Sequence, residues 1–418
     1  MKYDLGLNMK ALVFAGGGAK GAYQMGAWKA LRKLKMDFDI VTGTSIGALN
    51  GALYVQDSYY RGMRLWLTTD FYKLFGSDLE EMRDLKKAIK LYSNNVINKS
   101  GIDTDNFEKF VKRWINIDRF YKSKVEYGLV TYNLSDREPH FATKKKTKKE
   151  KMCDYIIASA SCFPAFELKE IDGDKFIDGG YYDNLPINLA IEMGADEVVA
   201  IELDSLGIRR SVKDKDVKVT YIRPSCDLGS FLVFDKKLIK RNMRIGFNDT
   251  MKVFGKLDGE KYTFKKNDLT KNYKKYGDDF AYIAKRMIGL NSKRTINQLT
   301  SITFYKRLIK SSFNDQKSMN KAIELLGEIY EIPNHKVYDI SMFNHILKMK
   351  FENYEDKELI DINHLKKLNF EKVVNRKQIV KSIYNFMLEP IEYHKEISDL
   401  SVLFPKEFIG ALYLYTIN

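Results

Sequence analysis

The chain has 418 residues, of which 44% are hydrophobic and 13% aromatic, and this is enough to bury the core of one large domain or of two. A disordered chain is thereby excluded. The formal net charge of +15 favours contact with something anionic, such as a phospholipid surface, a nucleic acid or an acidic substrate, without choosing among them.

The first residues and the cysteines indicate a compartment. Residues 1–10 lack the apolar core of a signal peptide, and no apolar run in the chain reaches the roughly 18 residues that a membrane span needs. Cys153, Cys162 and Cys226 have no metal-ligand spacing and fit buried thiols in a reducing compartment. We therefore expect a cytoplasmic protein, or one that lies peripherally on a membrane.

The first 225 residues alternate short β-branched runs with helical patterns, as a sheet covered by helices on both faces would. Strands are expected at 11–15, 38–43, 125–134, 175–178, 196–203 and 217–222. Helices are expected from the end of the first glycine-rich turn to about Leu34, at 45–55 and at 186–195. This half is predicted to be one α/β domain.

Three consecutive glycines follow the first expected strand. Gly16, Gly17 and Gly18 leave the backbone bare between this strand and the next helix. A P-loop is excluded, because Gly21 is not followed by the lysine and the hydroxyl residue that bind phosphate and magnesium.

The same turn matches a dinucleotide-binding fingerprint at Gly16, Gly18 and Gly21. That fingerprint also requires an acidic residue at the end of the second strand, where it holds the ribose hydroxyls. Asp37 and Asp39 stand at the beginning of this strand instead. A dinucleotide-dependent oxidoreductase is therefore a minor alternative.

The second strand ends in the pentapeptide GTSIG, residues 43–47, which is the pattern of a nucleophile elbow. Gly43 and Gly47 would avoid backbone collisions, and Ser45 would lie at a helix N-terminus that favours developing negative charge. The plain alternative is a turn that caps a helix. If Ser45 is a nucleophile, the N–H groups of the preceding glycine-rich turn can form its oxyanion hole.

A serine nucleophile needs a base, and the histidines do not supply an obvious one. Only His140 lies in the α/β half, whereas the other four lie in the second half: His335, His345, His364 and His394. A carboxylate can act instead where a dry site raises its pKa. Asp178, at the end of a short apolar strand in KFIDGGYYDNLP, is the best-placed candidate, although Asp-Gly is also ordinary turn chemistry.

Beyond about residue 255 the pattern changes to apolar residues spaced three and four apart, with Pro333 and Pro390 as breaks. Residues 255–418 are predicted to be mostly helical, with no role that the pattern indicates. Residues 226–254 are predicted to be a connecting helical segment.

Four motifs occur in order: GGGAKG (16–21), GTSIG (43–47), ASASCFPAFE (158–167) and DGGYYDNLP (178–186). Together they resemble the patatin-like phospholipase family, over residues 9–225. The resemblance implies a patatin-like three-layer α/β/α sandwich, here followed by a mostly helical C-terminal region. It also implies an acyl hydrolase with a Ser-Asp dyad that needs neither histidine nor calcium, and no cofactor.

The resemblance assigns roles residue by residue. Ser45 matches the nucleophile, and Asp178 matches the base. The backbone of the three consecutive glycines matches the oxyanion hole. The positions that support these motifs are Lys20, Gly21, Gly43, Gly47, Pro164, Gly179 and Gly180.

The expected function is hydrolysis of phospholipids or lysophospholipids through an acyl-enzyme. The alternative is a ligand-gated effector or binding module on the same fold, in which the helical half controls the active site.

A lysine run precedes the third motif. It contains Lys144, Lys145, Lys146, Lys148, Lys149 and Lys151. One hypothesis is that this loop rests on an anionic membrane and turns the active-site mouth toward it, at about 1 kcal/mol per lysine. The alternative is a solvated loop that serves solubility. Nucleic acid is not expected as a partner, because no aromatic residues interleave with the lysines.

Overall fold

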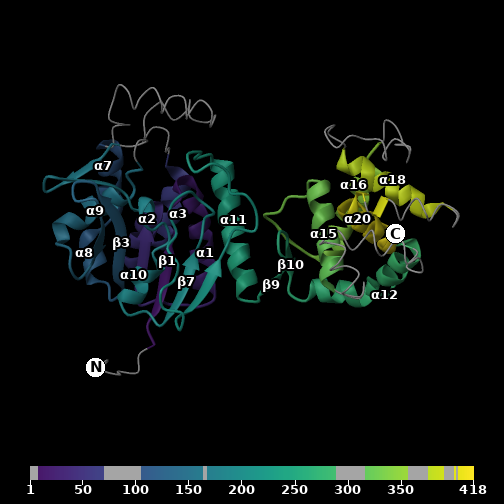
Figure 1. The fold of residues 1–418 in the computed structure, drawn as a ribbon, viewed down its shortest axis with the longest axis horizontal. Coiled ribbons are helices and arrows are strands. Elements are labelled where there is room, and N and C mark those ends of the chain that lie inside the picture. The colour runs from purple at the N-terminus through teal and green to yellow at the C-terminus, as the bar shows by residue number, and fades with distance from the viewer. Residues whose placement is uncertain are drawn as a thin grey trace. The chain divides into compact units, whose positions relative to one another are not determined.

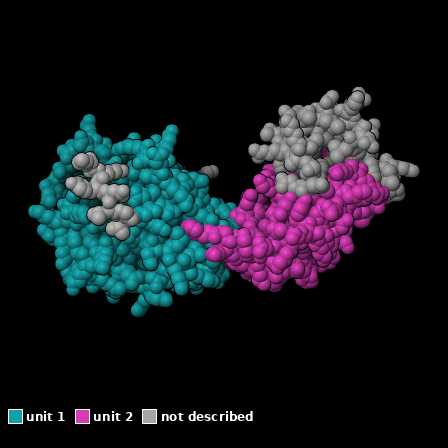
Figure 2. Space-filling view, turned by 90° about the horizontal axis from the view of Figure 1, so that it is seen from below, with its two compact units in different colours: residues 1–253 teal, residues 254–418 magenta. Residues whose placement is uncertain are grey.

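The computed structural model describes residues 8–69, 105–162, 167–288, 316–355, 375–389, 400, 401 and 403–418. Contacts divide the chain into two compact units, residues 1–253 and 254–418, which Figure 2 shows in two colours. Four residues considered above lie outside the described residues: Pro164, His364, Pro390 and His394.

The first unit is built on an eight-stranded mixed sheet (Figure 1). Its path runs β5 (Lys169–Ile171), β6 (Asp174–Asp178), β3 (Glu126–Asn133), β2 (Ile40–Thr44), β1 (Lys10–Phe14), β7 (Glu197–Ile201) and β8 (Lys218–Ile222), and β4 (Glu138–Thr143) pairs with β3. The strands β1, β2, β7 and β8 run parallel to β3, whereas β4 and β6 run antiparallel to it.

The helices of this unit are α1 (Ala22–Lys33), α2 (Ile46–Val55), α3 (Tyr59–Thr68), α7 (Asp105–Trp114), α8 (Ile117–Lys122), α9 (Met152–Ser159), α10 (Ile187–Glu192) and α11 (Lys236–Val253). Short 3-10 turns lie at Gly18–Gly21, Lys149–Lys151 and Gly179–Tyr181.

Helices cover both faces of the sheet. Gly51 of α2 lies against Tyr127, whereas Leu189 of α10 lies against Gly128. Because neighbouring residues of a strand point to opposite faces, α2 and α10 lie on opposite sides of β3. The predicted three-layer α/β/α arrangement is confirmed. Burial on both faces also explains why the central strand β1 is apolar throughout Leu12, Val13 and Phe14.

Six strands of this sheet lie in the ranges that the sequence predicts, and no range was predicted for β4 and β5. β5 has only three residues, and β4 begins at Glu138-Pro139, which breaks the alternation of a typical strand. β5 pairs with β6 across the turn at Asp172-Gly173, and β4 pairs with β3 across residues 134–137, so both strands belong to local hairpins.

The segment predicted to connect the two halves contains α11, which packs against α1 within the first unit. A Cβ on Gly246 would lie 2.0 Å from the carbonyl oxygen of Tyr23, so the two helices touch at their backbones. The Tyr23 hydroxyl also lies 3.1 Å from the carboxylate of Asp249.

The described residues of the second unit are mostly helical, as predicted. Its helices are α12 (Asp268–Ile288), α15 (Gln316–Ile329), α16 (Ile340–Glu352), α18 (Arg376–Leu388) and α20 (Pro405–Ile417), and a small sheet holds β9 (Leu257–Asp258), β10 (Thr263–Lys265) and β11 (Val337–Tyr338). Its core gathers fully buried residues from several of these helices, among them Leu326, Phe343 and Leu412. The unit therefore has its own apolar core.

Candidate active site

Ser45 occupies a strained turn between β2 and α2. Its φ of 56° is in the left-handed region that non-glycine residues seldom adopt. A Cβ on Gly47 would lie 2.4 Å from the carbonyl oxygen of Phe14, and one on Gly43 would lie 2.4 Å from that of Gly47. The elbow is thus pressed against the end of β1, beside the glycine-rich turn, and glycine is needed at both flanking positions.

Strand β3 brings Ser45 and Asp178 together. On β3, Val130 pairs with Thr44 at the end of β2, and the next residue, Thr131, pairs with Asp178 at the end of β6. Since β4 occupies the other edge of this stretch, β2 and β6 share one edge and approach each other end to end. Residues 133 positions apart in the sequence therefore meet at one point of the sheet.

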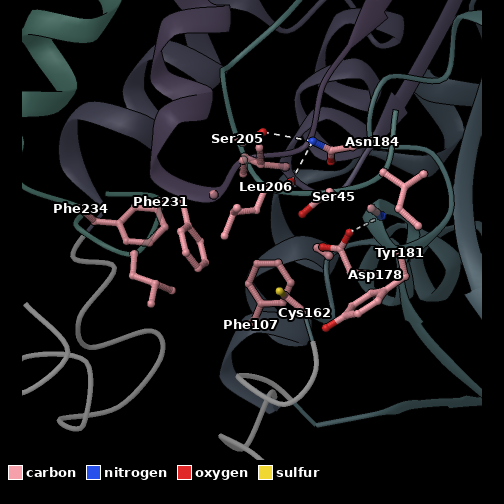
Figure 3. Close-up of a pocket in the computed structure, with 18 residues that line it drawn as sticks. Ser45, Phe107, Cys162, Asp178, Tyr181, Asn184, Ser205, Leu206, Phe231 and Phe234 are labelled. Atoms are coloured by element: carbon pink, nitrogen blue, oxygen red, sulfur yellow. Dashed lines mark hydrogen bonds between the residues drawn. The ribbon is translucent and has the colours of Figure 1, made fainter. Parts of the chain in front are cut away.

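The side chain of Ser45 lies beside the Asp178 carboxylate, close enough to lower the pKa of that group (Figure 3). Asp178 is only 5% exposed. Burial raises the pKa of Asp178 to about 6, and the hydrogen bonds from Ser45 and from the Gly180 N–H oppose this rise. The carboxylate is thus ionised at neutral pH and more basic than an ordinary aspartate.

The two glycines after Asp178 hold it in place. The Gly180 N–H donates to Asp178 Oδ1 at 2.7 Å (Figure 3). A Cβ on Gly179 would lie 2.0 Å from the carbonyl oxygen of Val130, so any larger residue would push the loop off β3. Both glycines that the motif includes therefore act on the position of the carboxylate.

The three consecutive glycines have different environments. The Gly16 N–H donates to the carbonyl oxygen of Asn184 at 3.0 Å, so it is already used. Gly17 and Gly18 line the cavity, and within the described ranges neither N–H has an acceptor. The expectation that all three glycine N–H groups are free to act as oxyanion donors is therefore wrong for Gly16.

Several contacts that the sequence did not reveal hold this turn. The Asn184 side-chain amide donates to the Gly16 carbonyl oxygen at 3.3 Å and to Ser205 Oγ at 3.0 Å (Figure 3). The Lys20 ammonium donates to the carbonyl oxygen of Asp204 at 2.7 Å. Gly21 packs against α2, since a Cβ there would lie 2.7 Å from a side-chain carbon of Ile46. The DNLP part of the fourth motif thus positions the first motif.

Ser159 is a further residue that sequence reasoning missed. Its fully buried hydroxyl accepts from the Ser45 N–H at 2.9 Å and donates to the Val130 carbonyl oxygen at 2.7 Å. It therefore ties the elbow to β3 beside Asp178. Ser159 belongs to the third motif. The serines of this motif were the only feature of the sequence that could have drawn attention to it.

The site opens into a cavity of about 480 Å³. Figure 3 shows Ser45 and Asp178 near one another, with aromatic and aliphatic side chains around them. The apolar lining residues are Ile46, Phe107, Tyr181, Leu206, Ile208, Phe231, Leu232 and Phe234. Three of them are also well exposed: Tyr181 by 45%, Ile208 by 49% and Leu206 by 85%. An apolar cavity with an apolar rim suits a long hydrocarbon chain.

Other reactive groups nearby are not placed for catalysis. His140 stacks on Tyr155, with ring centroids 4.6 Å apart, and no hydrogen bond joins it to Ser45 or Asp178 in the described part of the chain. Burial raises the pKa of Cys162 to about 12, so its thiol lines the cavity in the neutral form.

The lysine run begins near the start of β3, away from Ser45. The Lys144 N–H donates to the carbonyl oxygen of Tyr127, near the start of this strand, whereas Thr44, the neighbour of Ser45, pairs with Val130. Lys144 is partly buried and donates through its ammonium to the backbone, and Lys145 pairs with Glu126 at 3.5 Å. Two further members form ion pairs, Lys149 with Asp118 and Lys151 with Asp172.

No helix among the described residues is both long enough and apolar enough to cross a bilayer. The same residues contain no group of three or more His, Cys, Asp or Glu side chains that could hold a metal ion.

The described architecture is a three-layer α/β/α domain with an elbow serine and a buried aspartate at one apolar cavity. Residues 12–191 match the family model described as patatin-like phospholipase. This part of the chain is a patatin-like phospholipase domain, and its fold is the patatin-like sandwich that the motifs predicted.

The chain spans only a small part of the length of the curated relatives that it matches. Lysophospholipase nte1 of Aspergillus oryzae is 32% identical over 200 residues, which are 47% of this chain and 12% of that protein. Patatin-like phospholipase domain-containing protein 7 of Rattus norvegicus is 30% identical over 202 residues, 47% of this chain and 14% of that protein. The structure of VipD from Legionella pneumophila aligns with 98% of this chain and 92% of its own, at 14% identity and a TM-score of 0.41.

Proposed function

We propose that the protein is a serine lipid acyl hydrolase of phospholipase A or lysophospholipase type. The observation that carries the proposal is the placement of Ser45 beside the buried Asp178 at an apolar cavity. The names of the relatives, which include a lysophospholipase and patatin-like phospholipase domain proteins, support a lipid hydrolase.

In the proposed mechanism, Asp178 takes the hydroxyl proton of Ser45 while Oγ attacks the carbonyl carbon of the ester. The N–H groups of Gly17 and Gly18, helped by the N-terminus of α2, stabilise the oxyanion. Collapse of the tetrahedral intermediate breaks the ester bond, and the alcohol leaves with the proton from Asp178. Asp178 then activates a water molecule, which releases the fatty acid and restores Ser45.

The substrate class follows from the lining of the cavity. Its aromatic and aliphatic walls favour an acyl chain, and the exposed Leu206 and Ile208 at the rim would contact a lipid surface rather than water. We therefore propose phospholipid or lysophospholipid as substrate. The test is incubation with mixed phospholipids and lysophospholipids, with released fatty acid measured by mass spectrometry.

Contact of the lysine run with an anionic membrane remains a prediction. Its position at the start of β3 separates it from Ser45 by about four residues of strand, on the order of 13 Å. The expected orienting of the mouth by Lys144, Lys145, Lys146, Lys148 and Lys149 is therefore not supported. The lysine run could still attract the protein to anionic surfaces in general, and the vesicle experiment described below tests this.

The pH dependence of hydrolysis should follow the ionisation of Asp178. Only the ionised carboxylate can accept the Ser45 proton, and burial raises the pKa of Asp178 to about 6. The value of kcat/KM should therefore rise with pH up to about 6 and then level off, and fall as pH drops below it. A profile that is flat down to about pH 4, where an ordinary aspartate titrates, would contradict this assignment.

Asp183 provides a control for the pH profile. Burial raises its pKa to about 6 as well, but it does not line the cavity. Its Oδ1 accepts the Leu185 N–H at 3.2 Å, a bond that asparagine can also accept. The variant Asp183→Asn should keep the midpoint of the profile. If the midpoint near pH 6 disappeared in this variant, the pH dependence of kcat/KM would have to be assigned to Asp183 instead of Asp178.

Ser159 should act as a positioning residue. Ser159→Ala removes the acceptor of the Ser45 N–H, and we expect kcat to fall by about tenfold, as the loss of a buried hydrogen bond allows, with KM little changed. Ser161→Ala is the matched control, because its hydroxyl donates only to the Ile157 carbonyl oxygen of its own helix end, at 3.0 Å. Equal losses of kcat in the two variants would assign Ser159 a merely structural role.

A further inference from the structure

A second hollow of about 960 Å³ lies between α3 and α7. Its basic lining residues are Arg61 and Arg64 on α3, and Lys109 and Arg113 on α7. Aromatic and polar residues complete the lining: Tyr60, Thr68, Thr69, Asn106, Phe110 and Trp114. We call this feature the basic hollow.

The four cations face the hollow because of their helical spacing. Arg61 and Arg64 are three residues apart on α3, and Lys109 and Arg113 are four apart on α7, so each pair lies on one face of its helix. The neighbouring Lys112 differs, because it forms ion pairs with Glu108 at 3.7 Å and with Asp154 at 3.4 Å and does not line the hollow. The charge of Lys112 is thus neutralised, whereas the described residues provide no such ion pair for Lys109 and Arg113.

Within the described ranges, no carboxylate lines the basic hollow, and none pairs with its four cations. Like charges that face one another across a gap repel, and an anion between them removes this repulsion. All four side chains are exposed, so a ligand can reach them.

Part of the basic hollow is held in place without a ligand. The Arg61 guanidinium donates to the Arg113 carbonyl oxygen at 2.6 Å and lies over the Trp114 ring, 5.2 Å from its centroid. These contacts orient Arg61 and connect α3 to α7. A guanidinium that is already oriented loses less entropy when it binds a phosphate.

Helix α7 borders both the basic hollow and the catalytic cavity. Phe107 lines the cavity, whereas its neighbours Asn106 and Lys109 line the basic hollow. An anion bound there would therefore lie close to the mouth into which an acyl chain enters.

We propose that the basic hollow binds the phosphate of an anionic lipid headgroup, at a site separate from the catalytic cavity, and so anchors the domain on the bilayer. The chemistry it recognises is a phosphate group with more than one negative charge, which arginine binds well. A single hollow with four cations fits one headgroup, whereas a nucleic acid strand is bound along a groove that follows several phosphates. The apolar rim of the neighbouring cavity also favours a lipid surface.

The test is sedimentation of the full chain with phosphatidylcholine vesicles, with and without phosphatidic acid, at several salt concentrations. The variant Arg61→Gln, Arg64→Gln, Lys109→Gln, Arg113→Gln removes four charges from the basic hollow. A matched control removes four charges from the lysine run: Lys145→Gln, Lys146→Gln, Lys148→Gln and Lys149→Gln. Lys144 is left intact, because its ammonium bonds to the backbone.

We expect the hollow variant to bind phosphatidic acid vesicles at least about tenfold more weakly than the unmodified protein, while the lysine-run control loses much less. Hydrolysis of a short soluble ester should be unchanged in both. Equal losses in the two variants would mean attraction by net charge and would overturn the proposal. Because sedimentation reports binding to the vesicles and the soluble ester reports hydrolysis, failure of this proposal and failure of the proposed hydrolase activity can be told apart.

Two further arms separate other ligands. Saturable binding of inorganic phosphate that the hollow variant loses, without any binding to vesicles, would identify a soluble phosphate compound and overturn the lipid assignment. The protein could instead bind a single-stranded oligonucleotide more tightly than vesicles, and lose this binding in the hollow variant. That result would overturn the lipid assignment in favour of nucleic acid.

A second variant guards against misfolding. Arg64→Glu with Lys109→Glu leaves the contacts of Arg61 with Arg113 and Trp114 intact, and should still abolish most vesicle binding. Circular dichroism checks its fold. A folded double variant that binds phosphatidic acid vesicles as well as the unmodified protein would refute the proposal.

Discussion

Ser45→Ala should abolish both fatty-acid release and covalent labelling by a fluorophosphonate probe. The hydroxyl of Ser45 lies beside the buried Asp178, and its loss removes the nucleophile without changing the strained turn. We expect turnover to fall by about 10³-fold or more. The unmodified protein should be labelled at Ser45 and should release fatty acid with calcium chelated. Mass spectrometry of the labelled peptide and of the released acid measures both.

Ser205→Ala is the control for this experiment. Ser205 also lines the cavity, but its hydroxyl bonds to the carbonyl oxygen of Gly16 and accepts from Asn184. The Ser205 variant should therefore still be labelled. Labelling that persists in Ser45→Ala and disappears in Ser205→Ala would move the nucleophile to Ser205.

Asp178→Asn should lower kcat by about 10² or more, the scale expected when a general base is lost. Asparagine keeps the shape of the side chain and can still accept the Gly180 N–H, but it cannot take the proton of Ser45. The fold should survive, because the change removes a buried charge and leaves its volume unchanged. Steady-state hydrolysis of a soluble ester, with a thermal melt of each variant, measures the effect.

The histidine control separates a dyad from a triad. His140→Phe keeps an aromatic ring against Tyr155 and Phe176 but removes the imidazole nitrogens. Its activity should stay near that of the unmodified protein. A loss as large as that of Asp178→Asn would show that His140 takes part in proton transfer, and the dyad would have to be abandoned.

Local sequence patterns were sufficient to predict most of the strands and helices and to find the individual motifs. The apolar run before Gly16, the pentapeptide around Ser45 and the apolar strand before Asp178 each depend on residues only a few positions apart. The same holds for the helical spacing of the second unit. These features could be predicted because propensity, periodicity and turn chemistry act over short distances along the chain.

The assembly of the site was decided by strand pairing. Whether Ser45 meets Asp178 depends on β2 and β6 sharing one edge of β3, with Thr44 and Asp178 opposite consecutive residues of that strand. A different register would separate the two side chains by several ångströms, and no local pattern specifies the register between distant strands.

The sequence by itself thus determined the α/β class, the helical second half and the residues that deserved attention at the site. Only the tertiary structure decided that the Gly16 N–H is occupied, that Ser159 holds the elbow, and that the lysine run begins near the start of β3, away from Ser45. Hydrogen-bond partners and the two ends of a sheet are set by contacts between segments far apart in sequence. Motif spacing along the chain does not contain that information.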